Sequence, residues 1–177
     1  MSATTSGTLK TIRSTHSSLN LLTLDDADDL YRELADPVLF DALDDEPPAS
    51  ADDLRERLAA FVGSPHRGSE RWLTWTVRAG TGVDVPRVVG SVDATVHKRS
   101  RAASLGFCFG ADAAAGPHPA EALARAAEQL ARRFGVTSLE VETTRGNAPA
   151  AKLLRGLGFR NLRPDAEVAL WARTPAA

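Results

Sequence analysis

The residues best suited to proton transfer lie in one strand-like segment near the middle of the chain. Between Val88 and His97 apolar and polar residues alternate, which places Asp93 and His97 on one polar face of an expected strand. A carboxylate or an imidazole can take a proton from an attacking amine, so both are candidate catalytic residues. Four residues of strand separate them by about 13 Å, which allows them to flank a substrate without touching. The alternative is a solvated strand face ending in a basic turn.

Three other side chains are candidates for binding a ligand, and one cysteine is a candidate nucleophile. His118, in a segment rich in Gly and Pro, could donate a hydrogen bond to an anion, or could be an incidental loop residue. Trp72 faces away from an apolar row on its expected strand and could line a substrate pocket or pack beneath a helix. Cys108 has no sequence neighbour that would lower its thiol pKa, so we expect a core residue rather than a nucleophile. Asn147 is expected to cap a short helix.

Length and composition narrow the class of protein. The 177 residues, 43% hydrophobic and 25% charged, suit one domain with its own core. No apolar run reaches the roughly 20 residues of a membrane helix, and residues 1–7 lack the apolar segment of a secretory signal. The single cysteine excludes an intrachain disulfide and a cysteine-based zinc site. We therefore expect a cytoplasmic protein that needs no metal and does not enter a membrane.

Charge is unevenly distributed along the chain. The net charge of −2 argues against general nucleic-acid binding. Residues 1–89 nevertheless carry nine basic and fifteen acidic side chains, whereas residues 90–177 carry twelve and eight. The basic second half could steer an anionic partner toward it. The alternative is chance variation over a solvated surface.

The periodicity of apolar residues predicts a mixed α/β (α+β) domain over residues 19–177, preceded by a flexible tail at residues 1–18. Strands are expected at residues 19–23, 72–79, 88–97, 105–109, 136–143, 159–162 and 167–173. Helices are expected at residues 25–35, 50–62, 119–134 and 147–154, with Gly135 as the C-cap of the longest.

Five short motifs in this order resemble the GNAT superfamily of acyltransferases, most closely the branch that acetylates ribosomal-protein N-termini. They occupy residues 21–27 (LLTLDDA), 89–92 (VGSV), 105–109 (LGFCF), 121–123 (EAL) and 147–159 (NAPAAKLLRGLGF). The resemblance covers nearly the whole chain from Leu19 onward. It implies a mixed, mostly antiparallel sheet that splays into a V between its fourth and fifth strands, flanked by about four helices.

The resemblance also implies a binding site for an acyl donor. In this superfamily the pantetheine arm of the donor lies in the V, and its pyrophosphate binds backbone N–H groups at the start of the long helix. Acetyl-CoA or another acyl-CoA would be such a donor. The residues implied in donor binding are Phe107, Phe109, Gly110, Gly116, His118 and Asn147.

The expected pyrophosphate loop, residues 112–117, departs from the family pattern. Asp112 would repel a pyrophosphate, and Ala115 adds a Cβ where the backbone must come close. Pro117 and Pro119 have no N–H to donate. Each lost donor to a charged group costs on the order of 1.5–3 kcal/mol, so acetyl-CoA is expected to bind weakly. The alternative is a loop shifted by one residue, in which Gly110 or Gly116 forms a rearranged site.

Two proton carriers of the family are also replaced. Ser104 stands where the branch often has a glutamate, and Leu154 where many members have a tyrosine. The leading hypothesis is an acyltransferase that acts on an amine of a small molecule or peptide, without a metal. A second is a transferase whose donor is aminoacyl-tRNA or a carrier-protein thioester, favoured by the basic second half. A third is a catalytically silent binding module. The sequence is also compatible with a homodimer.

Overall fold

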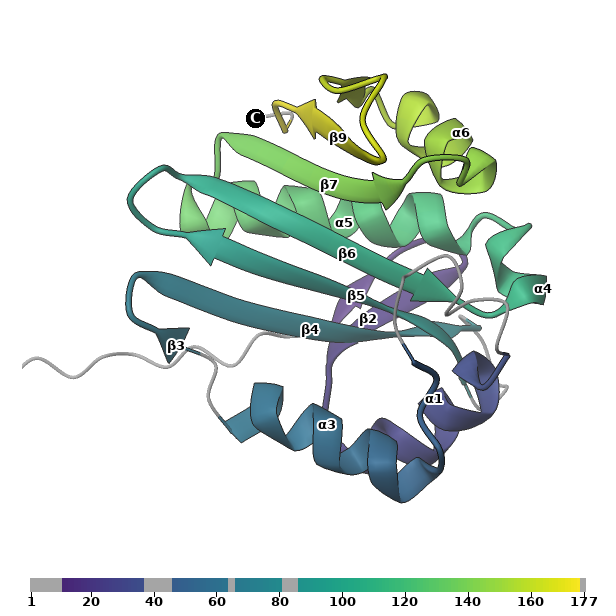
Figure 1. The fold of residues 1–177 in the computed structure, drawn as a ribbon. Coiled ribbons are helices and arrows are strands. Elements are labelled where there is room, and N and C mark those ends of the chain that lie inside the picture. Colours follow the sequence, from purple (N-terminus) through teal and green to yellow (C-terminus); the bar gives the residue numbers. More distant parts are fainter. Residues whose placement is uncertain (1–10, 37–45, 64–65, 81–85, 176–177) are drawn as a thin grey trace, which may run out of the picture.

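The structure of the protein is a computed structural model that describes residues 11–36, 46–63, 66–80 and 86–175 (Figure 1). One sheet runs through it in the order β1-β2-β4-β5-β6-β7-β9-β8, and β3 pairs with β4. The strands are β1 (Ile12–Arg13), β2 (Ser17–Leu21), β3 (His66–Arg67), β4 (Glu70–Ala79), β5 (Arg87–His97), β6 (Ala102–Phe109), β7 (Ser138–Thr144), β8 (Arg160–Asn161) and β9 (Val168–Arg173). The helices are α1 (Ala27–Leu34), α3 (Ala51–Gly63), α4 (Ala111–Ala114), α5 (His118–Phe134) and α6 (Ala148–Gly156), with a 3-10 turn at Leu24–Asp26.

The sheet opens between β6 and β7. These two strands are parallel and pair only from Ala102–Leu105 to Ser138–Val141, although both continue further. Beyond Leu105 they diverge, and α5 is visible behind the gap (Figure 1). All other pairs in the sheet are antiparallel. The mixed, mostly antiparallel sheet with a V between these strands is confirmed.

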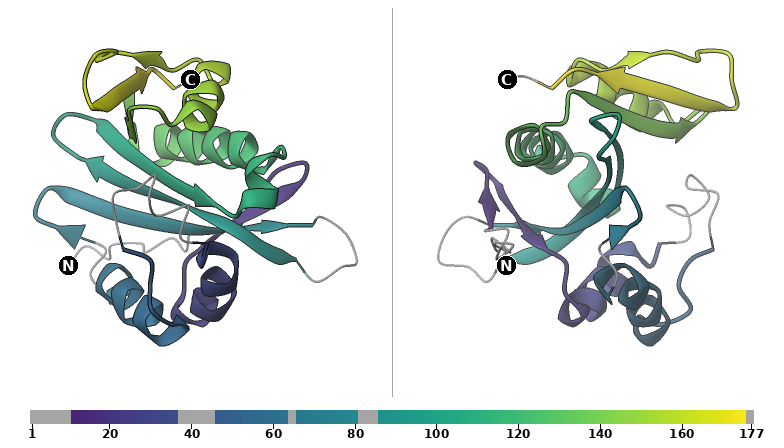
Figure 2. Two further views of the ribbon diagram at one scale, coloured as in Figure 1. Left: turned by 45° about the vertical axis from the view of Figure 1, so that its right-hand side comes forward. Right: turned by 90° about the vertical axis from the view of Figure 1, so that its left-hand side faces the viewer.

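Helices cover both faces of the sheet (Figure 2). On one face α5 buries an apolar stripe against the main core, and Gly135 ends it in the left-handed conformation at φ 64°, as expected of a C-cap. On the other face α1 and α3 enclose a smaller cluster around Leu22, Leu30 and Val88. Helix α4 was not expected from the sequence. No described helix is long and apolar enough to cross a membrane.

A β-bulge changes the alternation expected at the start of β5. Val77 pairs with Gly90 but its neighbour Arg78 pairs with Val88, so Val89 is the extra residue. Val89 therefore joins the main core, whereas Val88 packs under α1. The expectation that Val88 shares a face with Val92 was wrong, because one inserted residue reverses every side chain before it.

The sheet begins earlier than residue 19. β2 starts at Ser17, and β1 pairs with it, although residues 12–18 were expected to belong to a tail. Glu121 of α5 holds this segment: its carboxylate lies 2.6 Å from His16 Nδ1 and accepts the His16 backbone N–H at 3.0 Å. Burial opposes ionisation of Glu121, but the hydrogen bonds prevail and lower its pKa to about 2. This polar anchor lacks the apolar periodicity on which the prediction relied.

Candidate functional site

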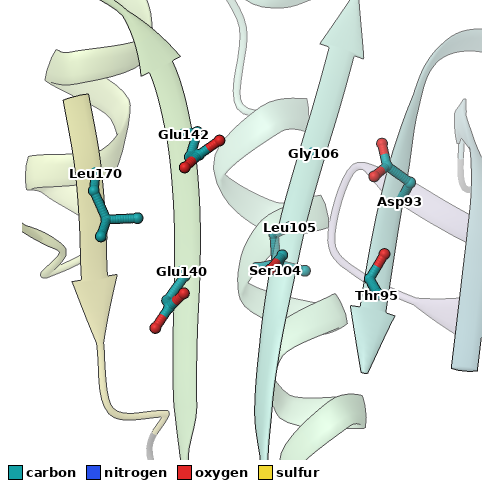
Figure 3. Close-up of a pocket in the computed structure, with 8 residues that line it drawn as sticks. All are labelled: Asp93, Thr95, Ser104, Leu105, Gly106, Glu140, Glu142 and Leu170. Carbon is teal, nitrogen blue, oxygen red and sulfur yellow. The ribbon is translucent and has the colours of Figure 1, made fainter. Parts of the chain in front are cut away.

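A pocket of about 270 Å³ opens on the sheet face opposite α5, where β6 and β7 begin to separate. β5, β6, β7 and β9 form it, and the side chains of β5 and β7 flank it from two sides (Figure 3). The lining residues are Asp93, Thr95, Ser104, Leu105, Gly106, Glu140, Glu142 and Leu170.

Asp93 lies beside the point at which the strands separate. It pairs across β5 and β6 with Gly106, and a Cβ on Gly106 would lie 2.5 Å from Asp93 Oδ1. The missing side chain therefore makes room for the carboxylate. Asp93 is accessible from the pocket, but the walls limit its hydration and raise its pKa, partly offset by the N–H groups of Asp93 and Gly106. A carboxyl group with a raised pKa is better matched to proton transfer near neutral pH.

Two further carboxylates give the pocket its charge. Glu140 and Glu142 alternate along β7 and point into the pocket with Asp93 facing them across β6 (Figure 3). No lysine or arginine is among the lining residues. The pocket is therefore suited to a cationic ligand, because each ammonium group would find a carboxylate nearby.

His97 reaches this pocket only through Ser104. Its Nε2 lies 3.3 Å from Ser104 Oγ, and its Nδ1 lies 3.4 Å from Glu70 Oε1. Trp72 donates its indole N–H to the other oxygen of Glu70 at 3.4 Å. Neither His97 nor Trp72 lines the pocket, so the structure does not bring Asp93 and His97 together. It places His97, Ser104 and Glu70 in a chain at the pocket's edge.

The end of β6 provides the wall of the V. Phe107 and Phe109 turn toward the main core, with ring centroids 6.4 Å apart. Cys108, on the opposite face, packs against the cluster under α1. Burial, reinforced by the negative charge of Asp93, raises the Cys108 pKa to about 11. The half-buried position and the raised pKa agree with the expectation of a packing residue rather than a nucleophile.

The segment between β6 and α5 coils into helix α4. Gly110 is its N-cap and accepts the Ala114 N–H, while Gly116 donates its own N–H to Ala113. A Cβ on Gly110 would lie 2.2 Å from Glu33 Oε1, so a carboxylate of α1 covers the start of this segment. These backbone groups therefore satisfy one another within the segment.

His118 follows at the first position of α5. Pro117 is the N-cap of this helix, and Pro119 follows His118. The two prolines have no backbone N–H to offer at the helix start. His118 Nδ1 is buried without a hydrogen-bond partner among the residues that the structure describes. A buried ring nitrogen without a partner is a free polar group at the mouth of the V.

Asn147 caps α6 as predicted. Its Oδ1 accepts the Ala150 N–H at 3.1 Å, which satisfies one of the free donors at the helix start. Asn147 also lines a second pocket, of about 260 Å³, between α6 and the strands β7 and β9.

Sequence reasoning missed the acidic wall and the residues around His97. Glu140 and Glu142 have the alternation of a strand, but the sequence does not give the register that sets Glu140 beside Ser104. Glu70 lies 27 residues from its partner His97. No group of three or more His, Cys, Asp or Glu residues suited to a metal occurs in the described segments.

Comparison with known proteins places this geometry in a family. Residues 18–160 match the model of the acetyltransferase (GNAT) domain. A search of curated proteins found no match.

Solved structures share the fold at low sequence identity. A ribosomal L7/L12 α-N-protein acetyltransferase in complex with coenzyme A has a TM-score of 0.77 and 16% identity over 93% of this chain and 98% of that chain. Spermidine N-acetyltransferase from Vibrio cholerae, in complex with CoA and spermine, has a TM-score of 0.73 and 14% identity over 92% and 97%. Ribosomal-protein-S5-alanine acetyltransferase from Vibrio fischeri has a TM-score of 0.74 and 14% identity over 94% of this chain and 97% of that chain. With the family model spanning most of the sequence, the chain belongs to the GNAT acetyltransferase family.

Proposed function

We propose that this N-acyltransferase moves an acyl group from a thioester donor in the V to a cationic amine bound in the acidic pocket. One observation carries the proposal: the pocket, with three carboxylates, opens where β6 and β7 separate. An amine held there would meet a thioester that reaches through the V. Holding both reactants in one geometry supplies much of the rate enhancement of such a transfer.

Asp93 is the proposed general base. The bound ammonium group gives one proton to the Asp93 carboxylate, and the freed nitrogen lone pair attacks the thioester carbonyl. The C–N bond forms and the C–S bond breaks, and the sulfur leaves as a thiolate that takes up the second proton released by the nitrogen as it becomes an amide. The edge of β6 beyond Leu105 has lost β7 as its partner, so backbone N–H groups there are available to polarise the carbonyl.

The acceptor is proposed to carry more than one positive charge. One ammonium group would face Asp93 while a second would lie near Glu140 or Glu142 on the opposite wall. Spermine, bound in the Vibrio cholerae neighbour, has this chemistry. The amino terminus of a basic peptide would also satisfy it, and ribosomal-protein acetyltransferases are among the neighbours. His97, acting through Ser104, is proposed to position the substrate rather than to take its proton.

The donor is proposed to depend little on the segment between β6 and α5. The residues present there do not fit a pyrophosphate: the N–H groups of Ala114 and Gly116 are used within the segment, two prolines have none, and the carboxylates of Glu33 and Asp112 lie nearby. The V itself fits an extended pantetheine-like arm. Acyl-CoA would thus bind weakly. The alternative donors are a thioester carried on a protein, or an aminoacyl-tRNA, in which the acyl group is held as an ester.

Replacing Asp93 tests the reaction. The Asp93→Asn variant keeps the shape of the side chain but cannot accept a proton, so kcat for acetyl transfer to spermine at saturating donor should fall at least ~100-fold. Because limited hydration raises the Asp93 pKa, wild-type kcat/KM should fall as the pH falls through a pKa above 3.8, the ordinary value. Asp165→Asn, which removes an exposed carboxylate outside the pocket, is the matched control.

Activity of Asp93→Asn within a few-fold of wild type would exclude Asp93 as the base. Absence of transfer by the wild-type protein to any di- or polyamine and to basic peptides would favour a silent binding module.

A further inference from the structure

The second pocket differs from the acidic pocket in both place and charge. It lies on the side of β7 that faces α6, under the loop that joins β8 and β9. Arg145 and Arg155 supply its charged groups, and Thr143, Asn147, Asn161 and Trp171 its other polar groups. No aspartate or glutamate is among the lining residues. The pocket therefore presents two guanidinium groups and several hydrogen-bond donors to one space of about 260 Å³.

Neither of these two arginines forms an ion pair with a carboxylate of the described segments. Seven arginines form ion pairs with carboxylates in the described part of the chain: Arg32, Arg55, Arg57, Arg78, Arg87, Arg125 and Arg132. No such pair joins Arg145 or Arg155 to a described carboxylate. Arg145 hydrogen-bonds to backbone atoms of the two nearby acidic residues: its backbone N–H donates to the Glu167 carbonyl, and its guanidinium donates to the Asp165 carbonyl.

Arg155 is held in place by an aromatic ring. Its guanidinium carbon lies 5.4 Å from the ring centroid of Trp171, which is buried and donates its indole N–H to Thr143 Oγ1 at 3.0 Å. A guanidinium group stacked in this way keeps its N–H edge free and loses little side-chain entropy when it binds a ligand. A planar N–H edge matches two oxygens of a phosphate group.

We propose that this pocket is a binding site for the phosphate group of an anionic ligand, with Arg145 and Arg155 as its cationic ligands. The segment Thr143–Asn147 that forms one wall also borders the open end of the V, because it continues β7 beyond its last pair with β6. A phosphate on the acyl donor could therefore reach the pocket while the thioester lies in the V. A separate phosphorylated effector would use the same chemistry.

Calorimetric titration with inorganic pyrophosphate tests the site without requiring acyl transfer. Wild-type protein should bind pyrophosphate, with sodium chloride at equal ionic strength giving no comparable heat. Arg145→Gln and Arg155→Gln should each weaken binding at least about tenfold, the usual scale for losing one charge-assisted hydrogen bond. Arg99→Gln, at the turn between β5 and β6 at the other end of the sheet, removes the same charge and should change binding less than about twofold.

Competition distinguishes the two sources of phosphate. If pyrophosphate raises the KM for the acyl donor in wild type but not in Arg145→Gln, the pocket serves the donor. Binding without such competition identifies a separate effector. Equal weakening in Arg99→Gln, or no pyrophosphate binding by a wild-type protein that transfers acyl groups, would overturn the phosphate site and leave the proposed reaction intact. Arg145 is exposed, so its variant should fold even if Arg155→Gln loses packing on Trp171.

Discussion

Asp93 and Cys108 lie close enough that the negative charge of Asp93 contributes to the raised pKa of Cys108. Loss of hydration affects both groups, but its chemical consequences for them are opposite. Reduced hydration by the surrounding residues raises the pKa of both groups. A raised pKa makes the carboxylate of Asp93 a stronger base. For a thiol, the same shift lowers the fraction of the reactive thiolate. These shifts favour Asp93 over Cys108 as the group that exchanges protons with a ligand in the pocket.

His97 should contribute through Ser104 and not as the base. We expect His97→Gln to lower kcat by about tenfold, well below the ~100-fold loss expected for a direct proton acceptor, because glutamine can still hydrogen-bond to Ser104. Steady-state kinetics of His97→Gln, Ser104→Ala and the double variant measure this. If the two residues act as one unit, the double variant should be no slower than the slower single variant. A loss above ~100-fold in His97→Gln alone, with Ser104→Ala unaffected, would make His97 the proton acceptor.

At the scale of elements, we expect Asn147 at the start of α6 to serve both the stability of the helix and donor binding. Asn147→Ala should destabilise the protein by about 1 kcal/mol, because the Ala150 N–H loses its acceptor. It should also weaken donor binding, since Asn147 lies at the mouth of the V. Chemical denaturation measures the first effect and titration with the donor the second. Ser50→Ala, which removes the acceptor of the Asp53 N–H at the start of α3, is a control for cap loss away from the V.

If Ser50→Ala weakens donor binding as much as Asn147→Ala does, the effect reflects stability alone and not contact with the donor.

At the scale of the whole molecule, the sheet divides charge between two sides of β7. The acidic pocket lies on the open face beside β6, and the arginine pocket lies on the side toward α6. A cationic acceptor and an anionic donor would thus be attracted to different sites. Their reactive ends would meet only at the base of the V. This separation requires a splayed sheet, because a fully paired β6 and β7 would leave no passage between the two faces.

Acetyl-CoA should bind weakly to this molecule, with a dissociation constant above about 100 μM by isothermal titration calorimetry. The reason is the segment between β6 and α5, where the N–H groups of Ala114 and Gly116 are already paired and two prolines have none. Changing Asp112 to Arg, Ala115 to Gly and Pro117 to Gly together should restore measurable binding if this segment alone is at fault. A low-micromolar constant for wild type would contradict the expectation. A repaired variant that still fails to bind would place the defect within the V.

The sequence by itself determined the order of the elements and the family. Apolar periodicity and caps are local signals, so α5 with Gly135, α6 with Asn147 and the long strands were predicted close to their observed bounds. The polar face of β5 was predicted for the same reason, since alternation along one strand needs no knowledge of its neighbours. The early start of the sheet at Ile12 and helix α4 were missed, because polar anchors and four-residue helices leave no periodic pattern.

Only the tertiary structure decided which of the candidate residues share a site. Strand register brings Asp93 of β5 next to Gly106 of β6, while β7 adds Glu140 and Glu142 from more than 40 residues away along the chain. Register also gives His97 Glu70 of β4 and Ser104 of β6 as partners. These contacts depend on pairing between distant segments, and a single bulged residue such as Val89 is enough to reverse the faces of the residues before it.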